Sequence, residues 1–346
     1  MKNILYLILL ISVSLIFQSC SDDPEDILPL IPSFTLSDCI PQNGFPSTAS
    51  SYAEMVESEL GIVPTVHLDS MIEIPLYQNG QQVYGVFYDA NSLDNPTRLG
   101  KLTVSGSALK RYQGISSDGS ILPNVVWVAF LRNVTEYITN PEGSLQIIGY
   151  NQLSGATAFF ESMDNVGQFV SNVEPITFKL SGVMPGPNSN MFNQAYRTPS
   201  SDFQCISCHQ ADPFITNPFI NAAKIPGTNE SVVPHLGANS PYHVIGGYDW
   251  DMRTIHIEGN QCMACHRVGL STVRLFEDNG YDVNTHMPPT NPGSLSDDYL
   301  ELLEAWINGP ENTPGAEWKI PPTCNDPGKI VGDDYPYKQP FNNYGF

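Results

Sequence analysis

The stretch Val125-Val-Trp-Val-Ala-Phe-Leu131 is a continuous apolar run of the length of one β-strand. Other runs rich in β-forming residues lie on both sides of it, with turn residues between them. These runs are 82–88, 101–105, 145–150, 156–160 and 176–180, and residues 151–155 read as a hairpin loop. We predict a β-rich domain over residues 34–182, either a sandwich or an open barrel.

The β pattern stops after residue 182. Residues 183–200 are rich in Pro, Asn and Ser and are predicted to form a linker. Residues 201–324 hold most of the seven cysteines and seven histidines and are predicted to form a mostly α-helical, loop-rich domain. Residues 325–346 are predicted to be an extended C-terminal tail. The expected fold class is therefore α+β.

The composition fits a folded and acidic protein. The chain has 346 residues, of which 41% are apolar, and its formal charge is −21. Such a surface repels phosphate backbones, so we expect no nucleic-acid partner. An acidic surface instead favours partners with a basic docking face.

Two five-residue motifs carry the chemistry: Cys205-Ile-Ser-Cys208-His209 and Cys262-Met-Ala-Cys265-His266. Both match C-x-x-C-H, the attachment signature of c-type haem. Two thiols at this spacing can form thioether bonds to one haem, and the adjacent histidine can serve as an axial ligand of the iron. We therefore predict two covalently bound haem c groups as cofactors, with His209 and His266 as axial ligands.

Three other interpretations compete for these cysteines. A Cys₄ zinc site commonly spaces its two C-x-x-C units by about 15–20 residues, and the distance from Cys208 to Cys262 is far greater. A thioredoxin-like redox pair would need one motif rather than two. Disulfides within each motif are possible in an oxidising compartment. None of the three explains a histidine directly after both motifs.

Residues 255–310 resemble the closing part of a class I cytochrome c domain. The second motif is followed by Met287-Pro288-Pro289, and then by a predicted helix that starts near Ser296 and ends at Gly309-Pro310. The apolar stripe of that helix contains Leu300, Leu303 and Ile307. The resemblance implies that Met287 is the distal ligand of the second haem, with His286 or a core-packing role for Met287 as the alternatives.

The distal ligand of the first haem is less well defined by the sequence. His243 and His256 are the principal candidates. His235, Met252 and Met191 are further candidates. The remaining alternative is a five-coordinate iron, whose open position would permit ligand binding or peroxide chemistry.

The N-terminus resembles a bacterial lipoprotein signal. A short positive start and an apolar run precede Cys20, so residues 1–19 are predicted to be the signal peptide and Cys20 the lipidated residue. Residues 20–33 are predicted to be a tether, whose acidic cluster resembles a surface-export signal. We expect an outer-membrane lipoprotein that faces the periplasm or the cell surface. An ordinary signal peptide is the alternative.

Cys39 and Cys324 remain after haem attachment and lipidation. In an oxidising compartment they are predicted to form a disulfide, with two free thiols as the alternative. The function expected from these features is single-electron transfer between redox partner proteins by a lipid-anchored dihaem c-type cytochrome. A peroxidase-like haem oxidoreductase with one open haem is the first alternative. A surface binding protein with accessory haems is the second.

Overall fold

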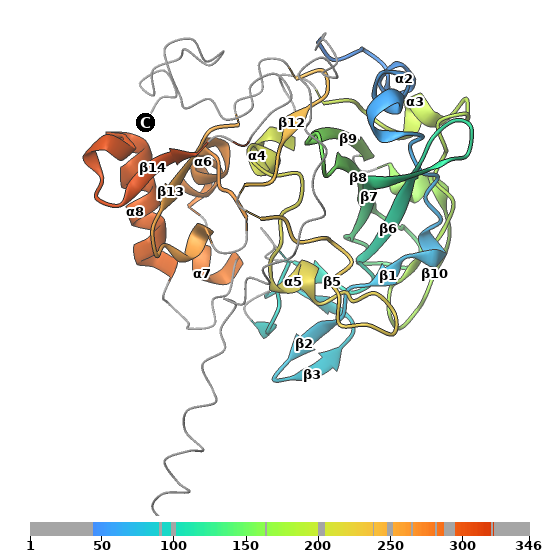
Figure 1. Cartoon of the computed structure of the whole chain (residues 1–346). Helices are drawn as coiled ribbons and strands as arrows, with labels where there is room; N and C mark the ends of the chain where they lie inside the picture. Colours follow the sequence, from blue (N-terminus) through green and yellow to red (C-terminus); the bar gives the residue numbers. More distant parts are fainter. Residues whose placement is uncertain are drawn as a thin grey trace, which may run out of the picture. The chain divides into compact units, whose positions relative to one another are not determined.

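The largest element of the structure is a six-stranded mixed sheet with the strand order β1-β6-β7-β8-β9-β12 (Figure 1). The computed structural model describes residues 44–89, 92–97, 102–162, 165–199, 205–237, 239–247, 252–263, 266–280, 282–286, 295–319 and 321. The strands of the sheet are β1 (Ile72–Glu73), β6 (Ala108–Ile115), β7 (Ile121–Asn133), β8 (Gly143–Asn151), β9 (Ala156–Ser162) and β12 (His243–Val244). Neighbouring strands pair antiparallel, except that β12 pairs parallel with β9.

The helices and the smaller sheets are short. The α-helices are α2 (Ala49–Leu60), α3 (Phe192–Ala195), α4 (Cys205–His209), α5 (Pro218–Asn221), α6 (Leu270–Asn279), α7 (Val283–His286) and α8 (Leu295–Asn308). The two-stranded sheets pair β2 (Leu76–Gln78) with β3 (Gln81–Val83), β4 (Val86–Phe87) with β5 (Thr103–Val104), β10 (Val170–Val173) with β11 (Leu180–Gly182), and β13 (Thr254–Ile257) with β14 (Ala316–Lys319).

Strand β7 is buried on both of its faces. Side chains alternate along a strand, so Trp127, Ala129 and Leu131 point to one face and Val126 and Val128 to the other. The first three belong to one hydrophobic cluster and the last two to a second cluster. The uninterrupted apolar run in the sequence is thus explained by a sheet that is covered on both sides.

Helix α2 covers the first face. Thr48 caps the helix, because its Oγ1 accepts a hydrogen bond from the backbone N of Ser51 at 3.2 Å. The helix ends at Gly61, whose φ of 70° is unfavourable for any other residue. The indole of Trp127 donates to the carbonyl of Leu60 at 3.0 Å and so ties the end of the helix to the central strand.

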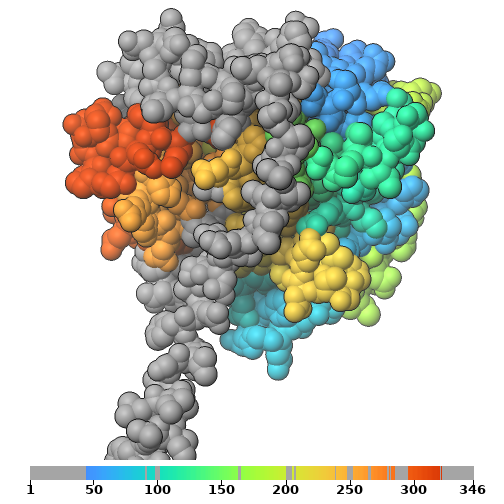
Figure 2. All heavy atoms as spheres, viewed as in Figure 1, coloured from blue at the N-terminus to red at the C-terminus, as the bar shows by residue number. Residues whose placement is uncertain are grey.

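The second face is covered by residues 205–247. Phe214 and Val232 of this segment share the second hydrophobic cluster with the sheet. The guanidinium of Arg111 on β6 donates to the carbonyls of Ser231 and Val232 at 2.7 Å each. In Figure 2 the yellow atoms of this segment lie against the cyan and green atoms of the sheet region.

A third cluster lies among residues 254–319. Helices α6 and α8 pack with the β13–β14 pair around Ile255, Leu270, Leu302 and Trp306. The rings of Trp306 and Trp318 meet edge to face, with centroids 5.4 Å apart. Across the described ranges, the structure has no helix that is long and apolar enough to span a bilayer.

The predicted fold class is wrong. The chain is β-rich around one six-stranded mixed sheet, and it is neither a sandwich nor an open barrel followed by a mostly helical cytochrome c domain. The physical reason lies in residues 205–247, which bury their apolar side chains against the sheet instead of around a helical core. Strand β12 of that segment even joins the sheet itself.

The predicted bounds of helix α8 are confirmed, because the helix starts at Leu295 and its last residue is Asn308. Asp297 and Asp298 lie in its first turn, and the helix stops before Gly309, which has a φ of 84°. Of the three residues of the predicted apolar stripe, Leu303 is buried, whereas Leu300 and Ile307 are 53% and 51% exposed. The helix buries a neighbouring stripe instead, made of Leu295, Leu302, Leu303, Ala305 and Trp306.

Candidate functional site

The first motif forms the short helix α4, which spans Cys205 to His209. Residues at positions i, i+3 and i+4 share one face of a helix. Cys205, Cys208 and His209 have this spacing, and all three line the same cavity. The helix is short because Asp212-Pro213 follows it, and a proline disfavours helical backbone at the residue before it.

The cavity has a volume of about 420 Å³, within the ~300–1,000 Å³ typical of small-molecule and cofactor sites. Its walls are the second face of the sheet and the segment that covers that face. Most of the lining side chains are apolar or aromatic. They include Leu109, Val128, Phe130, Ile148 and Phe159 from the strands, and Phe214, Phe219, Ile220 and Val233 from the covering segment.

A few polar side chains also line the cavity. Glu161 is only 7% exposed, and one of its carboxylate oxygens accepts a hydrogen bond from Nε2 of Gln146 at 3.2 Å. Arg132 lines the cavity as well, with its guanidinium carbon 5.8 Å from the ring centroid of Phe130. The cavity is therefore an apolar pocket with a small number of polar groups, the usual make-up of a cofactor site.

The thiol of Cys205 is held in its protonated form. Burial raises its pKa well above the usual range, and the nearby Glu161 and Cys208 raise it further. A thiolate is the form that attacks disulfides and binds zinc. The surroundings of Cys205 therefore favour the protonated thiol over the thiolate in the chain without a bound group.

His209 is fixed by two contacts. Its ring packs on Phe159, with centroids 5.3 Å apart. Its Nδ1 lies 3.3 Å from the carbonyl oxygen of Asp212. A carbonyl can only accept a hydrogen bond, so this contact has Nδ1 as the donor and fixes the orientation of the ring.

The described residues of the second motif, Cys262, Met263 and His266, do not line the cavity. Cys262 belongs to the 3₁₀ turn Gln261–Met263 and packs on the third hydrophobic cluster. Cys265 is outside the described residues. His266 is buried, and its Nδ1 lies 3.2 Å from the carbonyl of Arg267. Burial lowers the pKa of His266, and the nearby Asp212 carboxylate partly opposes that effect.

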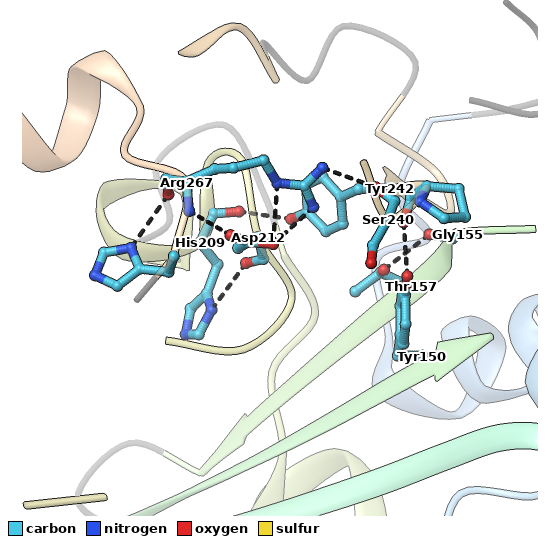
Figure 3. A network of polar contacts seen from close by, with 10 residues as sticks. Tyr150, Gly155, Thr157, His209, Asp212, Ser240, Tyr242 and Arg267 are labelled. Atoms are coloured by element: carbon cyan, nitrogen blue, oxygen red, sulfur yellow. Dashed lines mark hydrogen bonds and ion pairs between the residues drawn. The ribbon is translucent and has the colours of Figure 1, made fainter. Parts of the chain in front are cut away.

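An ion pair joins the residues that follow the two motifs (Figure 3). Arg267 donates from Nη2 and Nε to Oδ1 of Asp212 at 2.6 and 3.1 Å, and its backbone N donates to Oδ2 at 2.5 Å. Its Nη1 donates to the carbonyl of Ser240 at 2.7 Å. The hydroxyl of Tyr242 donates to the carbonyl of His209 at 2.5 Å. The two motifs are thus linked through buried polar groups.

Neither distal candidate for the first haem lines the cavity. His243 lies on β12 and is buried, with no hydrogen-bond partner at Nδ1, and burial lowers its pKa to about 4. His256 lies on β13, opposite Glu317 of β14. Four other predicted site residues, Met287, Cys20, Cys39 and Cys324, are outside the described residues.

The predicted cofactor set of two covalently bound haem c groups is wrong. Within the described ranges, no group of three or more His, Cys, Asp or Glu side chains could hold a metal ion. The cavity lies beside the first motif, and none of the described residues of the second motif lines it.

Several functional residues were not found from the sequence. Glu161, Gln146 and Arg132 sit on strands, and only the fold brings them to the cavity. The sequence does offer one indication of the pair Asp212–Arg267. Each residue follows shortly after one of the two motifs, and the two side chains have opposite charges.

Comparison with known proteins gives no match, because no family model, no curated protein and no solved structure is detectably similar to this chain.

Proposed function

We propose that this protein transfers single electrons outside the cytoplasm, as c-type cytochromes do, with one redox group in the cavity beside the first motif. The observation that carries the proposal is that Cys205, Cys208 and His209 lie on one helix face and line one cavity of about 420 Å³. Two thiols and an imidazole in this arrangement suit a flat group that is attached through both sulfurs and bound at its metal by the histidine.

The walls of the cavity favour such a group over a free metal ion. The protein would attach such a group through the two cysteines and bind its metal through His209, and all three residues line the cavity. The apolar side chains of the strands would keep water away from the bound group. The group would supply the change of oxidation state, while the chain holds and orients it.

One observation favours the peroxidase-like alternative as a second candidate. Among the described residues that line the cavity, His209 is the only histidine, and none of the others is a methionine. Among these residues only His209 would supply an imidazole to a bound metal, and a small substrate such as peroxide would have room beside it. Glu161 is a buried carboxyl group at the same cavity.

The cellular setting is proposed from the sequence. Lipidation at Cys20 would anchor the chain to the outer membrane, facing the periplasm or the cell surface. The formal charge of −21 would favour redox partners with a basic docking face.

The test is to produce the full chain in a host that exports it and attaches redox groups to exported proteins. We expect one covalently attached redox group at the first motif, seen as added intact mass and as new visible absorption. Cys205→Ala with Cys208→Ala should abolish the attachment at this site. Cys262→Ala is the matched control and should leave that attachment unchanged. A chain with no group on the peptide that contains Cys205 and Cys208 would refute the proposal.

Carbon monoxide and hydrogen peroxide then separate the two candidates. A carrier with both axial positions filled should bind neither at a significant rate and should still exchange electrons rapidly with small dyes. Rapid binding of carbon monoxide, together with peroxide turnover, would favour the enzyme.

A further inference from the structure

We infer that one buried ion pair, Asp212–Arg267, positions the histidines of both motifs, so that His209 and His266 are held as a single unit. The geometry is reciprocal. The backbone carbonyl of Asp212 accepts from Nδ1 of His209 at 3.3 Å, and the backbone carbonyl of Arg267 accepts from Nδ1 of His266 at 3.2 Å. Each residue of the pair therefore holds one motif histidine with its main chain while its side chain binds the other residue of the pair.

The ion pair is built to be rigid. The side chains of Asp212 and Arg267 are 6% and 8% exposed. Both carboxylate oxygens of Asp212 accept from Arg267, and the guanidinium also binds the carbonyl of Ser240. A planar guanidinium that is held at this many points has little freedom to reorient. Figure 3 shows Asp212 between His209 and Arg267, with Ser240 and Tyr242 beyond the guanidinium.

Two further contacts join the same two segments. Tyr242 is fully buried, its hydroxyl donates to the carbonyl of His209 at 2.5 Å, and its ring centroid is 6.0 Å from the guanidinium carbon of Arg267. Gln210 accepts from the backbone N of Ser271 at 2.7 Å. A movement of Asp212 would therefore displace the segment that carries His266 as well as the one that carries His209.

The hydrogen bond at Nδ1 sets the orientation and basicity of a ligating imidazole. Asp212 and Arg267 are thus positioning residues for the redox site, and they extend their effect to His266, which does not line the cavity. This role rests on the proposed function for its chemical consequence. The mechanical coupling of the two histidines stands on the contacts alone.

The test uses the isolated full chain, labelled with ¹⁵N in its histidine side chains. The readout is the rate at which the Nδ1 protons of His209 and His266 exchange with water, which needs no activity. We expect Asp212→Asn to speed the exchange of both protons at least tenfold, although His266 lies in the other segment. Arg267→Lys keeps the charge and should give a smaller change in the same two protons.

The control is Glu230→Gln, which breaks the more exposed ion pair with Arg111 and should change neither proton. The inference is overturned if Asp212→Asn affects His209 alone, or if neither proton responds. If Asp212→Asn does not fold, Arg267→Lys decides the question by the same two-proton criterion.

The reduction potential of the attached group separates this inference from the proposed function. A chain that carries no group refutes the function but leaves the exchange measurement intact. A loaded chain should show a potential that shifts in both Asp212→Asn and Arg267→Lys and stays constant in Glu230→Gln.

Discussion

Replacing Asp212 with Leu should destabilise the fold far more than breaking an ordinary surface ion pair. The carboxylate is almost fully buried and accepts three hydrogen bonds from Arg267. Removing one partner leaves a buried guanidinium without its counter-charge, which typically costs about 3–5 kcal/mol. Exposed pairs typically contribute only about 0–1 kcal/mol.

Urea unfolding monitored by tryptophan fluorescence would measure this loss. With a slope of about 3 kcal/mol/M, the expected loss corresponds to a midpoint that is lower by roughly 1–2 M. Arg267→Met should give a loss of similar size. The double variant should lose less than the two single variants together, because it leaves no unpaired charge, and a coupling free energy of about 1–3 kcal/mol is expected.

The matched control is the pair Arg111–Glu230, whose side chains are 24% and 59% exposed. Glu230→Gln should lower the free energy of unfolding by about 1 kcal/mol or less. The reasoning fails if Asp212→Leu costs no more than Glu230→Gln. It also fails if the losses of the two single variants at the buried pair simply add up in the double variant.

Three shorter predictions concern other residues. Burial lowers the pKa of His243 to about 4, so on acidification the unfolded chain binds a proton at this histidine before the folded chain does. The contribution of His243 to stability should be complete above pH 6.5 and fall by about 3 kcal/mol as the pH drops to about 4, and His243→Asn should reduce this loss in urea titrations at several pH values. A Cβ on Gly149 would come 2.6 Å from the ring of Trp127, so Gly149→Ala should cost about 1–3 kcal/mol, while Gly237→Ala, whose nearest atom is 3.9 Å away, should be neutral by thermal unfolding. In a chain without an attached group, the raised pKa of Cys205 should make its alkylation at pH 8 at least tenfold slower than in the urea-unfolded chain, and equal rates in peptide mass mapping would contradict this.

The local elements were largely predictable from the sequence. The apolar run at 125–131 became part of strand β7, and the runs at 145–150 and 156–160 became parts of β8 and β9. The hairpin loop at 151–155 closes with the backbone N of Gly155 donating to the carbonyl of Asn151 at 2.8 Å. Each of these depends on neighbours in the chain, which is the information that a local pattern holds.

The missed elements depend on distant partners. Strand β6 carries Lys110, Arg111 and Gln113 among its apolar residues, so its strand character becomes clear only beside β7. The two residues of β12 are too few to form any pattern. The run at 176–180 was predicted as a strand, but the chain turns there, with a φ of 58° at Phe178, and pairs only from Leu180 onward.

In the candidate site, too, the local features were predictable from the sequence and the features that depend on distant residues were not. The shared helix face of Cys205, Cys208 and His209 follows from their spacing alone. The cavity beside them does not, because its walls come from strands that are far away in the sequence. The link from Asp212 to Arg267 likewise spans 55 positions, and no local pattern could have predicted it.

The covered second face of the sheet has a consequence for how the protein is made. The strands β6 to β9 precede in the chain the residues that cover them, so in a chain without residues 205–247 Val128, Ile148 and Phe159 would face water. The edge of β9 at Ala156 and Thr157 would also lack its partner strand β12. A chain that ends near residue 182 should therefore be aggregation-prone and dependent on chaperones. A premature stop codon there should yield insoluble aggregates rather than a soluble N-terminal fragment.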